Sequence, residues 1–255
     1  MKICCTFICL FIYGYSQTDT LHTVIRSKSD TTDKMDTFRS FEVAFFENIV
    51  RIYNTKFNTN FFIKYYVVDE FSEIRPLIQS RLAEKKFVVG VSGFTIVNHE
   101  MFDYSASFFP VKTSLIILKE RREALLHKKV LDVGYYTSLY YKEIVKNLHH
   151  KFGMQLHRGK TGKSYLKSKE LDAYISDSIE AWVDEEPDIL LDAHEMVDHI
   201  GFLYLKNSPL KKMFDPIIKY YTKTKRFYKN LKYYFGDSFP KYYCETLGIP
   251  YRSAD

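Results

Sequence analysis

Cysteine is almost missing from this sequence of 255 residues, and most of it lies at the very beginning. Three of the four cysteines are Cys4, Cys5 and Cys9, and only Cys244 follows them. A chain that loses its first residues on export keeps a single cysteine, which excludes a disulfide within the chain. We therefore expect a fold that is held together by packing alone, in spite of an oxidising compartment.

The sequence also lacks a long polar low-complexity tract, a basic arm and the ligand spacing of a zinc site. The first absence, together with 46% hydrophobic residues, indicates a folded chain rather than a disordered one. The formal net charge of +6 is mild for this length, and basic residues are interleaved with acidic ones. We expect no nucleic-acid partner, although tyrosine and lysine are abundant.

The N-terminus has the pattern of a secretory signal peptide. A lysine at the second position is followed by an apolar run at residues 3–13, interrupted by one threonine and too short to span a bilayer. Gly14 and Ser16 then place small residues at both recognition positions of a signal-peptidase site. We predict cleavage near Ser16 and a periplasmic or secreted location, with a short N-terminal core segment as the alternative. No later segment has the uninterrupted apolar length of a membrane helix.

Hydrophobic periodicity predicts two successive α/β units. In the first, strands at 21–26, 61–68 and 87–91 alternate with helices at 41–53 and 71–82. After a strand at 113–118 and a charged stretch at 119–129, the pattern restarts with strands at 130–133, 154–157, 171–176, 189–191 and 200–205. The helices of this second unit are expected at 138–151, at 163–169 and from 179. A helical stretch at 210–235, interrupted near Pro216, and a polar tail at 237–255 complete the chain. This order indicates doubly wound sheets with ligand chemistry at the carboxyl ends of the strands.

Short patterns that resemble metal or phosphate motifs have the wrong spacing. His194 and His199 are five residues apart, whereas two histidines on one helix face must be four apart, so we interpret them, with Glu195, as exposed loop residues before a strand. The stretch at 159–164 lacks the earlier glycine that a phosphate loop requires, which makes it a basic turn. We therefore predict neither a metal nor a cofactor.

Several stretches, taken in order, resemble the family 3 extracellular solute-binding proteins that serve amino-acid ABC importers. They are FSEIRPLIQSRL at 71–82, VSGFTIVNHEMFDYS at 91–105, GYYTS at 134–138, LDAYISDSIEA at 171–181 and IGFLYLKNSPL at 200–210. The ligand domains of ionotropic glutamate receptors share this architecture. The resemblance implies a monomeric two-lobed "Venus flytrap", with lobe 1 at 17–116, lobe 2 at 117–205 and helices at 206–236 that return to lobe 1. It also implies a small-molecule ligand, and an ABC permease or a membrane sensor as partner.

The resemblance implies a role for several residues of the cleft. Phe71 stands where the family has a cleft-lining aromatic. The residues that would grip a ligand carboxylate are Ser92, Gly93 and Thr95 on one loop, and Thr137 and Ser138 at the start of a helix, where free amides favour an anion. Asp177 matches the acid that binds a ligand ammonium group. Its alternative role is the N-cap of the helix that follows.

The sequence departs from the family at the position of a carboxylate-clamping arginine. An ungapped alignment places Glu100 there, and a carboxylate at that point would repel a ligand carboxylate. Tyr136 also replaces a glycine before Thr137. We therefore expect the fold to carry over better than the ligand, and we predict a cationic or amine-bearing ligand that is held by Asp177 and Glu100.

Three functions remain open on the sequence. The first is a secreted solute-binding protein, not an enzyme, that captures a small polar ligand in the cleft between the lobes. The second is a periplasmic cyclohexadienyl (prephenate or arogenate) dehydratase, in which Glu100 or Asp177 would supply the acid. The third is a degenerate receptor module that contacts a partner through the basic, tyrosine-rich helix at 219–234.

Overall fold

A computed structural model describes residues 18–27, 35–136, 145–146, 153–183 and 187–251 of the chain. The predicted signal peptide and most of the predicted helix at 138–151 lie outside the described residues. Among the described helices, none combines the length and the apolar character that a membrane crossing requires.

Nine strands of the described residues form one mixed sheet with the order β2-β1-β3-β9-β5-β8-β6-β7, and β4 pairs with β9 beside this path. Their bounds are β1 (Thr18–Arg26), β2 (Asn60–Val68), β3 (Val88–Thr95), β4 (Phe102–Tyr104), β5 (Phe109–Leu118), β6 (Leu131–Tyr135), β7 (Met154–Arg158), β8 (Ala173–Asp177) and β9 (Pro187–Leu205). At one end of the sheet β1 pairs in parallel with β2 and β3, and at the other end β6 pairs in parallel with β7 and β8. The predicted doubly wound arrangement therefore occurs twice.

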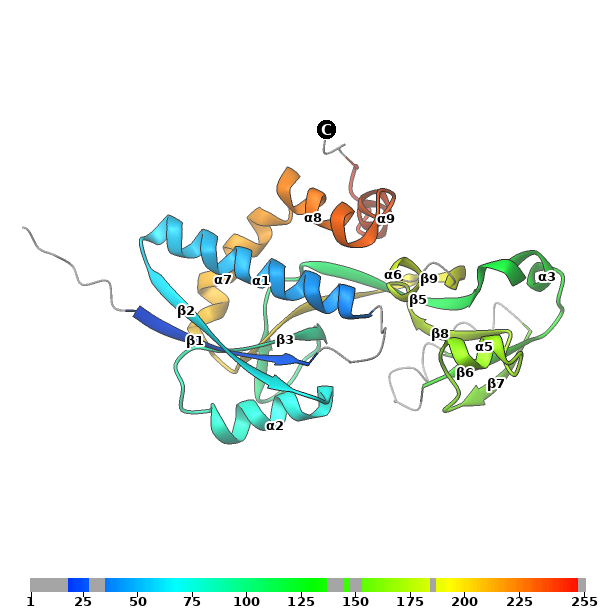
Figure 1. The fold of residues 1–255 in the computed structure, drawn as a ribbon, viewed down its shortest axis with the longest axis horizontal. Coiled ribbons are helices and arrows are strands. Elements are labelled where there is room, and N and C mark those ends of the chain that lie inside the picture. The colour runs from blue at the N-terminus through cyan, green and yellow to red at the C-terminus, as the bar shows by residue number, and fades with distance from the viewer. Residues whose placement is uncertain (1–17, 28–34, 137–144, 147–152, 184–186, 252–255) are drawn as a thin grey trace, which may run out of the picture.

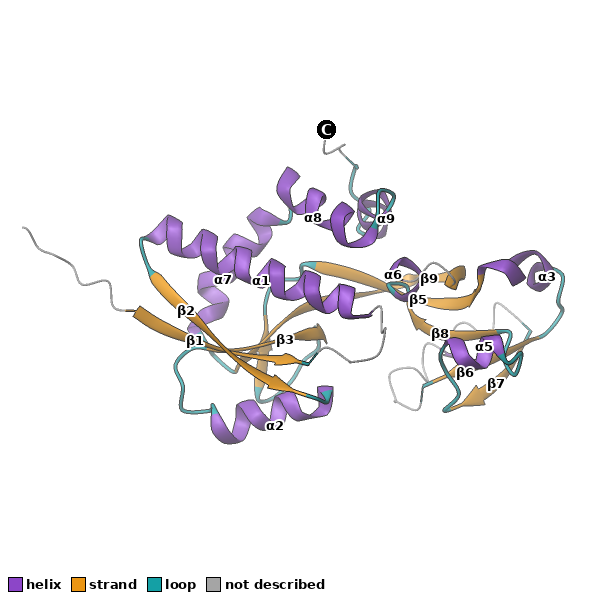
Figure 2. Ribbon diagram, in the orientation of Figure 1, coloured by secondary structure: helices purple, strands orange, loops and turns teal. Residues whose placement is uncertain are grey.

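Helices cover both faces of the sheet at the β1 end (Figure 1). The helical segments are α1 (Met35–Phe57), α2 (Phe71–Arg81), a 3₁₀ turn (Lys119–Arg121), α3 (Arg122–Leu126), α5 (Lys163–Lys167), α6 (Glu180–Val183), α7 (Pro209–Tyr221), α8 (Lys225–Phe235) and α9 (Phe239–Thr246). In the view of Figure 2, α1, α7 and α8 lie above β1–β3 and α2 lies below. The crossover from β1 through α1 to β2 and the crossover from β2 through α2 to β3 run in opposite directions along the sheet. Because both crossovers are right-handed, α1 and α2 lie on opposite faces.

The two ends of the sheet have separate hydrophobic cores, which define the two lobes. Lobe 1, built on β1–β4 with α1, α2 and α7–α9, has a core rich in phenylalanine. Phe108, for example, packs with ring centroids 4.6 Å from Phe45 and 4.7 Å from Phe202. Lobe 2, built on β6–β8 with α3 and α5, has a smaller aliphatic core around Leu131, Val133 and similar residues. The aromatic ring pairs of lobe 1 stabilise its core by more than the burial of their surface area alone.

Strands β5 and β9 run antiparallel across both lobes, from the pair Phe109–Ile200 to the pair Leu118–Pro187. The prediction of two short strands at 189–191 and 200–205 is wrong, because one strand of 19 residues covers both. His194, Glu195 and His199, expected in a loop, belong to this strand. β5 pairs with Asp192 before the polar run and with Val197 after it, and a register shift between these pairs accommodates the extra residues. We propose that the boundary between the lobes crosses β5 and β9, since β9 from Ile200 onward pairs with β3 of lobe 1.

The C-terminal region also differs from its prediction. The helical stretch is interrupted at residues 222–224 rather than near Pro216, which lies inside α7. Thr224 begins α8 as its N-cap, with its hydroxyl accepting from the N–H of Phe227 at 3.3 Å. The apolar face of α7 packs on α1, and this packing stabilises the helix in spite of the proline within it.

The expected polar tail contains a helix instead. Phe239 and Tyr243 of α9 are buried one turn apart against the lobe 1 core, as is Cys244. The single tryptophan of the sequence, Trp182 on α6, packs against α9 with ring centroids 5.2 Å from Phe239 and 4.9 Å from Tyr242. Helix α9 therefore connects the segment after β8 to lobe 1.

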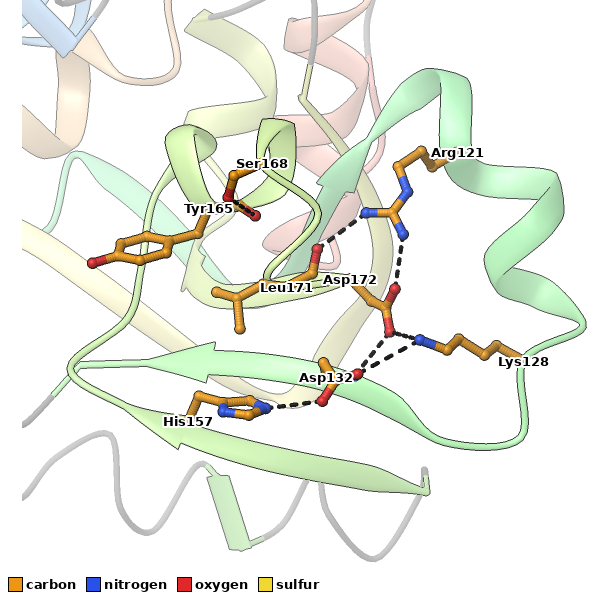
Figure 3. A network of polar contacts seen from close by, with 8 residues as sticks. All are labelled: Arg121, Lys128, Asp132, His157, Tyr165, Ser168, Leu171 and Asp172. Atoms are coloured by element: carbon orange, nitrogen blue, oxygen red, sulfur yellow. Dashed lines mark hydrogen bonds and ion pairs between the residues drawn. The ribbon is translucent and has the colours of Figure 1, made fainter.

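Charged side chains hold lobe 2 together around the buried Asp172 at the start of β8 (Figure 3). Its carboxylate accepts from Arg121 at 2.8 Å, from the N–H of Asp132 at 2.9 Å and from Lys128. Asp132 in turn contacts Nε2 of His157 on β7 at 2.9 Å. Burial opposes ionisation of Asp172, but the Lys128 ammonium, the Asp132 amide and the Arg121 guanidinium outweigh it and hold its pKa below the ordinary value.

Replacing Asp172 with asparagine is expected to lower the free energy of unfolding by roughly 2–3 kcal/mol at pH 7, because two cations lose their carboxylate. A lowered pKa in the folded state gives stability that is present above the unfolded pKa of about 3.9 and lost as the pH falls through the folded value. Urea unfolding of both proteins at pH 7 and below pH 4 checks this. The difference should shrink in acid, and a difference that does not depend on pH would contradict the assignment.

Candidate functional site

A cavity of about 160 Å³ lies where lobe 1 meets the end of β8. It is bounded by the carboxyl ends of β1, β3 and β8, by the first turns of α1 and α2, and by β5 and β9. The lining residues are Arg26, Phe38, Arg39, Glu42, Phe71, Ser92, Gly93, Val111, Asp177, Ile179 and Ile200. This is the crevice outside the strand ends that open α/β sheets use for ligands. Its volume is below the roughly 300–1,000 Å³ typical of drug-sized ligands, so it suits a small one.

Half of the predicted site residues meet at this cavity. Phe71, Ser92 and Gly93 line it from lobe 1, and Asp177 lines it from the end of β8. Thr95, at the end of β3, does not line it. Thr137 and Ser138 lie outside the described residues.

Glu100 lies in lobe 1 near the C-terminal end of β9 rather than beside the cavity. The chain leaves β3 at Thr95, opposite Ile200, and returns in β4, where Phe102 faces Leu205. Met101 accepts from the N–H of Lys206, so Glu100 is roughly 20 Å along β9 from the cavity-lining Ile200. The ungapped alignment that placed Glu100 at the arginine position followed sequence adjacency, and the pairing of β4 with β9 overrides it.

Glu42 of α1 is the acid that the sequence reasoning missed. It lines the cavity although only 1% of its surface is exposed, and its Oε1 accepts from the N–H of Gly93 at 2.7 Å. Burial raises the pKa of Glu42 to about 8, against smaller opposing effects of the Gly93 hydrogen bond and the Arg39 charge. A signal was present, because Glu42 lies four residues from both Phe38 and Phe46 and so interrupts the buried face of the helix.

Asp177 ends β8 opposite Thr113 of β5. Within the described part of the chain, its carboxylate has no hydrogen bond or ion pair, which leaves the alternative N-cap role without a contact. Burial raises its pKa to about 7, and the charges of Asp198 and Glu180 add to this effect. The cavity thus has a carboxyl group on each of two walls, each with a raised pKa.

Two arginines also reach the cavity, and each has contacts with its own neighbours. Arg39 pairs with Asp36 at 2.6 Å, one turn earlier in α1. Arg26 donates from Nε to the carbonyl of Asp69 at 3.1 Å and lies 3.9 Å from the carboxylate of Glu70. The Arg39 guanidinium is thus paired within α1, whereas Arg26 has one backbone hydrogen bond and a longer, exposed contact with Glu70. Across the described ranges, no group of three His, Cys, Asp or Glu residues is placed to hold a metal ion.

The two-lobed arrangement around this cavity is that of the periplasmic-binding-protein-like α/β fold, as predicted. No protein-family model and no curated protein matches the sequence. Among solved structures, an ancestral cationic amino-acid solute-binding protein superposes at a TM-score of 0.59 and 15% identity, covering 85% of this chain and 95% of that one.

Two further structures have the same fold. The L-cystine solute receptor of Neisseria gonorrhoeae, in an unliganded open conformation, matches at TM-score 0.58 and 14% identity, with coverages of 88% and 96%. The arginine-, lysine-, histidine-binding protein of Geobacillus stearothermophilus matches at 0.55 and 16%, with coverages of 86% and 96%. The resemblance to family 3 solute-binding proteins therefore extends to the three-dimensional fold.

Replacing Glu42 with glutamine is expected to remove a pH-dependent loss of stability. A raised folded-state pKa gives stability that is fully present below the unfolded pKa of about 4.3 and lost as the pH rises through 8. Relative to wild type, Glu42→Gln should therefore gain roughly 3 kcal/mol between pH 5 and pH 8.5, while its amide oxygen still accepts from Gly93. Urea midpoints at the two pH values measure this, and equal pH slopes for the two proteins would contradict it.

Proposed function

We propose that this protein is a solute-binding protein that works outside the cytoplasm and captures a small, amine-bearing ligand in the cavity. The observation that carries the proposal is the Asp177 carboxyl group, which lines the cavity and has no partner among the described residues. An ammonium group is the partner that such a carboxylate lacks. Relatives of the same fold that are named as solute-binding proteins, one of them for cationic amino acids, support the proposal.

The other walls of the cavity suit a small cation. Phe71 lines the cavity, is 40% exposed and packs on Phe94 with ring centroids 5.0 Å apart, and an aromatic ring of this kind can attract an ammonium group. Ser92 adds a hydroxyl to the lining. Asp198 and Glu180, which act on Asp177, make the surrounding potential negative.

Capture would use movement of the lobes about β5 and β9. Asp177 is the last residue of a lobe 2 strand, whereas Phe71, Ser92 and Gly93 belong to lobe 1. A ligand that contacts both sides stabilises the arrangement in which they are close. Delivery to an ABC permease, or signalling through a membrane sensor, is the use that we propose for this capture.

Asp177→Asn is expected to abolish amine binding while leaving the fold intact. For the wild type, a ligand at about 100 times its Kd adds about 2.7 kcal/mol, which raises the Tm by roughly 5–10 °C for a chain of this size. Thermal shifts across alkylamines, diamines, amino acids and neutral polyols measure this directly.

The matched control is Asp237→Asn, which changes an acid whose side chain is 81% exposed and does not line the cavity. It should respond to ligand as the wild type does. The proposal is wrong if no amine shifts the wild type, or if Asp177→Asn responds like the control.

The affinity for an amine is expected to weaken by about tenfold for each pH unit below 7, since protons then compete for Asp177. The groups facing Asp177 are Asp198 of β9 and Glu180 of α6, with Glu42, Arg39 and Arg26 in the rest of the cavity lining. Calorimetric titrations at pH 5.5, 6.5 and 8 check the trend. An affinity that is constant over this range would exclude Asp177 as the ammonium partner.

A further inference from the structure

Resting on the proposed function, we propose that Glu42 is a second ligand-binding carboxylate and that the ligand is a compact diamine without a carboxylate of its own. Two amino groups, one at Asp177 and one at Glu42, would then be bound from opposite walls of the cavity.

The first step of the argument concerns the loop at Ser92 and Gly93. The family resemblance assigns the backbone of this loop to a ligand carboxylate. In this protein the N–H of Gly93 already donates to Oε1 of Glu42 at 2.7 Å. A carboxylate of the protein thus occupies the donor that a ligand carboxylate would need, and a ligand carboxylate beside Glu42 would be repelled.

The second step concerns the charge on Glu42. Of the described residues, Gly93 is the only hydrogen-bond partner of its side chain, and no ion pair joins it to a basic group. Arg39, one turn before it, is directed to Asp36. A carboxyl group that is 1% exposed and lines a cavity needs either a proton or a cation, and burial without one is costly.

The third step compares the two walls. Glu42 comes from α1 of lobe 1, and Asp177 comes from the end of β8. A small dication matches two carboxylates in charge and fits a cavity of about 160 Å³. An amino acid with the same two amino groups adds a negative charge for which the engaged arginines and the occupied Gly93 amide offer little compensation.

The test is calorimetric titration at pH 8 with three probes: 1,4-diaminobutane, butylamine and ornithine. Butylamine lacks the second amino group, and ornithine adds a carboxylate to the diamine. For the wild type we expect 1,4-diaminobutane to bind at least tenfold tighter than either of the other two.

Three variants separate the roles of the acids. Glu42→Gln keeps the acceptor for Gly93 and should lose most of the preference for the diamine over butylamine, with butylamine affinity nearly unchanged. Asp177→Asn should lose all three ligands. Glu47→Gln, on the exposed side of the same helix and bonded to Tyr65 at 2.7 Å, is the matched control and should bind as the wild type does.

The outcomes distinguish this inference from the proposed function. If ornithine binds more tightly than the diamine, or if Glu42→Gln keeps the diamine preference, the inference is overturned while amine capture at Asp177 stands. If no probe binds to the wild type, both are overturned. Circular dichroism and thermal unfolding of each variant show whether a loss of binding reflects a loss of folding.

Discussion

The antiparallel pairing of β5 with β9 is the constraint on which the rest of the structure depends. These two strands pass through both lobes, so a single hydrogen-bonded sheet replaces the separate sheets that two independent domains would have. The parallel units at either end of the sheet take their orientation from this ladder. The cavity lies beside it, with Val111 of β5 and Ile200 of β9 in its lining. The position of Asp177 relative to lobe 1 is therefore set by how these strands twist and shift in register.

The chemistry of the cavity follows from two acidic side chains in its lining. Glu42 and Asp177 are surrounded by too little positive charge, because the nearby arginines are directed to Asp36, Asp69 and Glu70. The buried Glu42 and the partly buried Asp177 have raised pKa values, and neither has an ion pair among the described residues. Acidic groups without a nearby cation are common at functional sites, where a bound ligand provides the opposite charge.

Local periodicity was sufficient to predict the elements with strong, self-contained patterns. The helix expected at 71–82 is α2, and the strand expected at 61–68 is β2, because their apolar spacing leaves little choice. Features that depend on distant pairing escaped prediction. The polar run around His194 belongs to a strand because β5 pairs with the residues on either side of it, Asp192 and Val197, and Glu100 lies far from the cavity because β4 pairs with β9.

Of the two acidic residues of the candidate site, one was predicted from the sequence and the other was not. Asp177 was predicted from a sequence motif, and the structure places it on the cavity. Glu42 was not among the predicted site residues, although its spacing from Phe38 and Phe46 puts it on the buried face of the helix. Its importance depends on Gly93, 51 residues later in the chain, and no local pattern relates the two.

The lone tryptophan has a consequence for observing the molecule. Trp182 lies five residues after Asp177 and rests against the aromatic rings of α9, which belongs to lobe 1. Indole fluorescence excited at the red edge of its absorption band comes from this one point of the chain. Its colour and intensity therefore report the local surroundings at the junction of the two lobes. The sequence thus contains an optical probe of lobe movement and needs no attached dye.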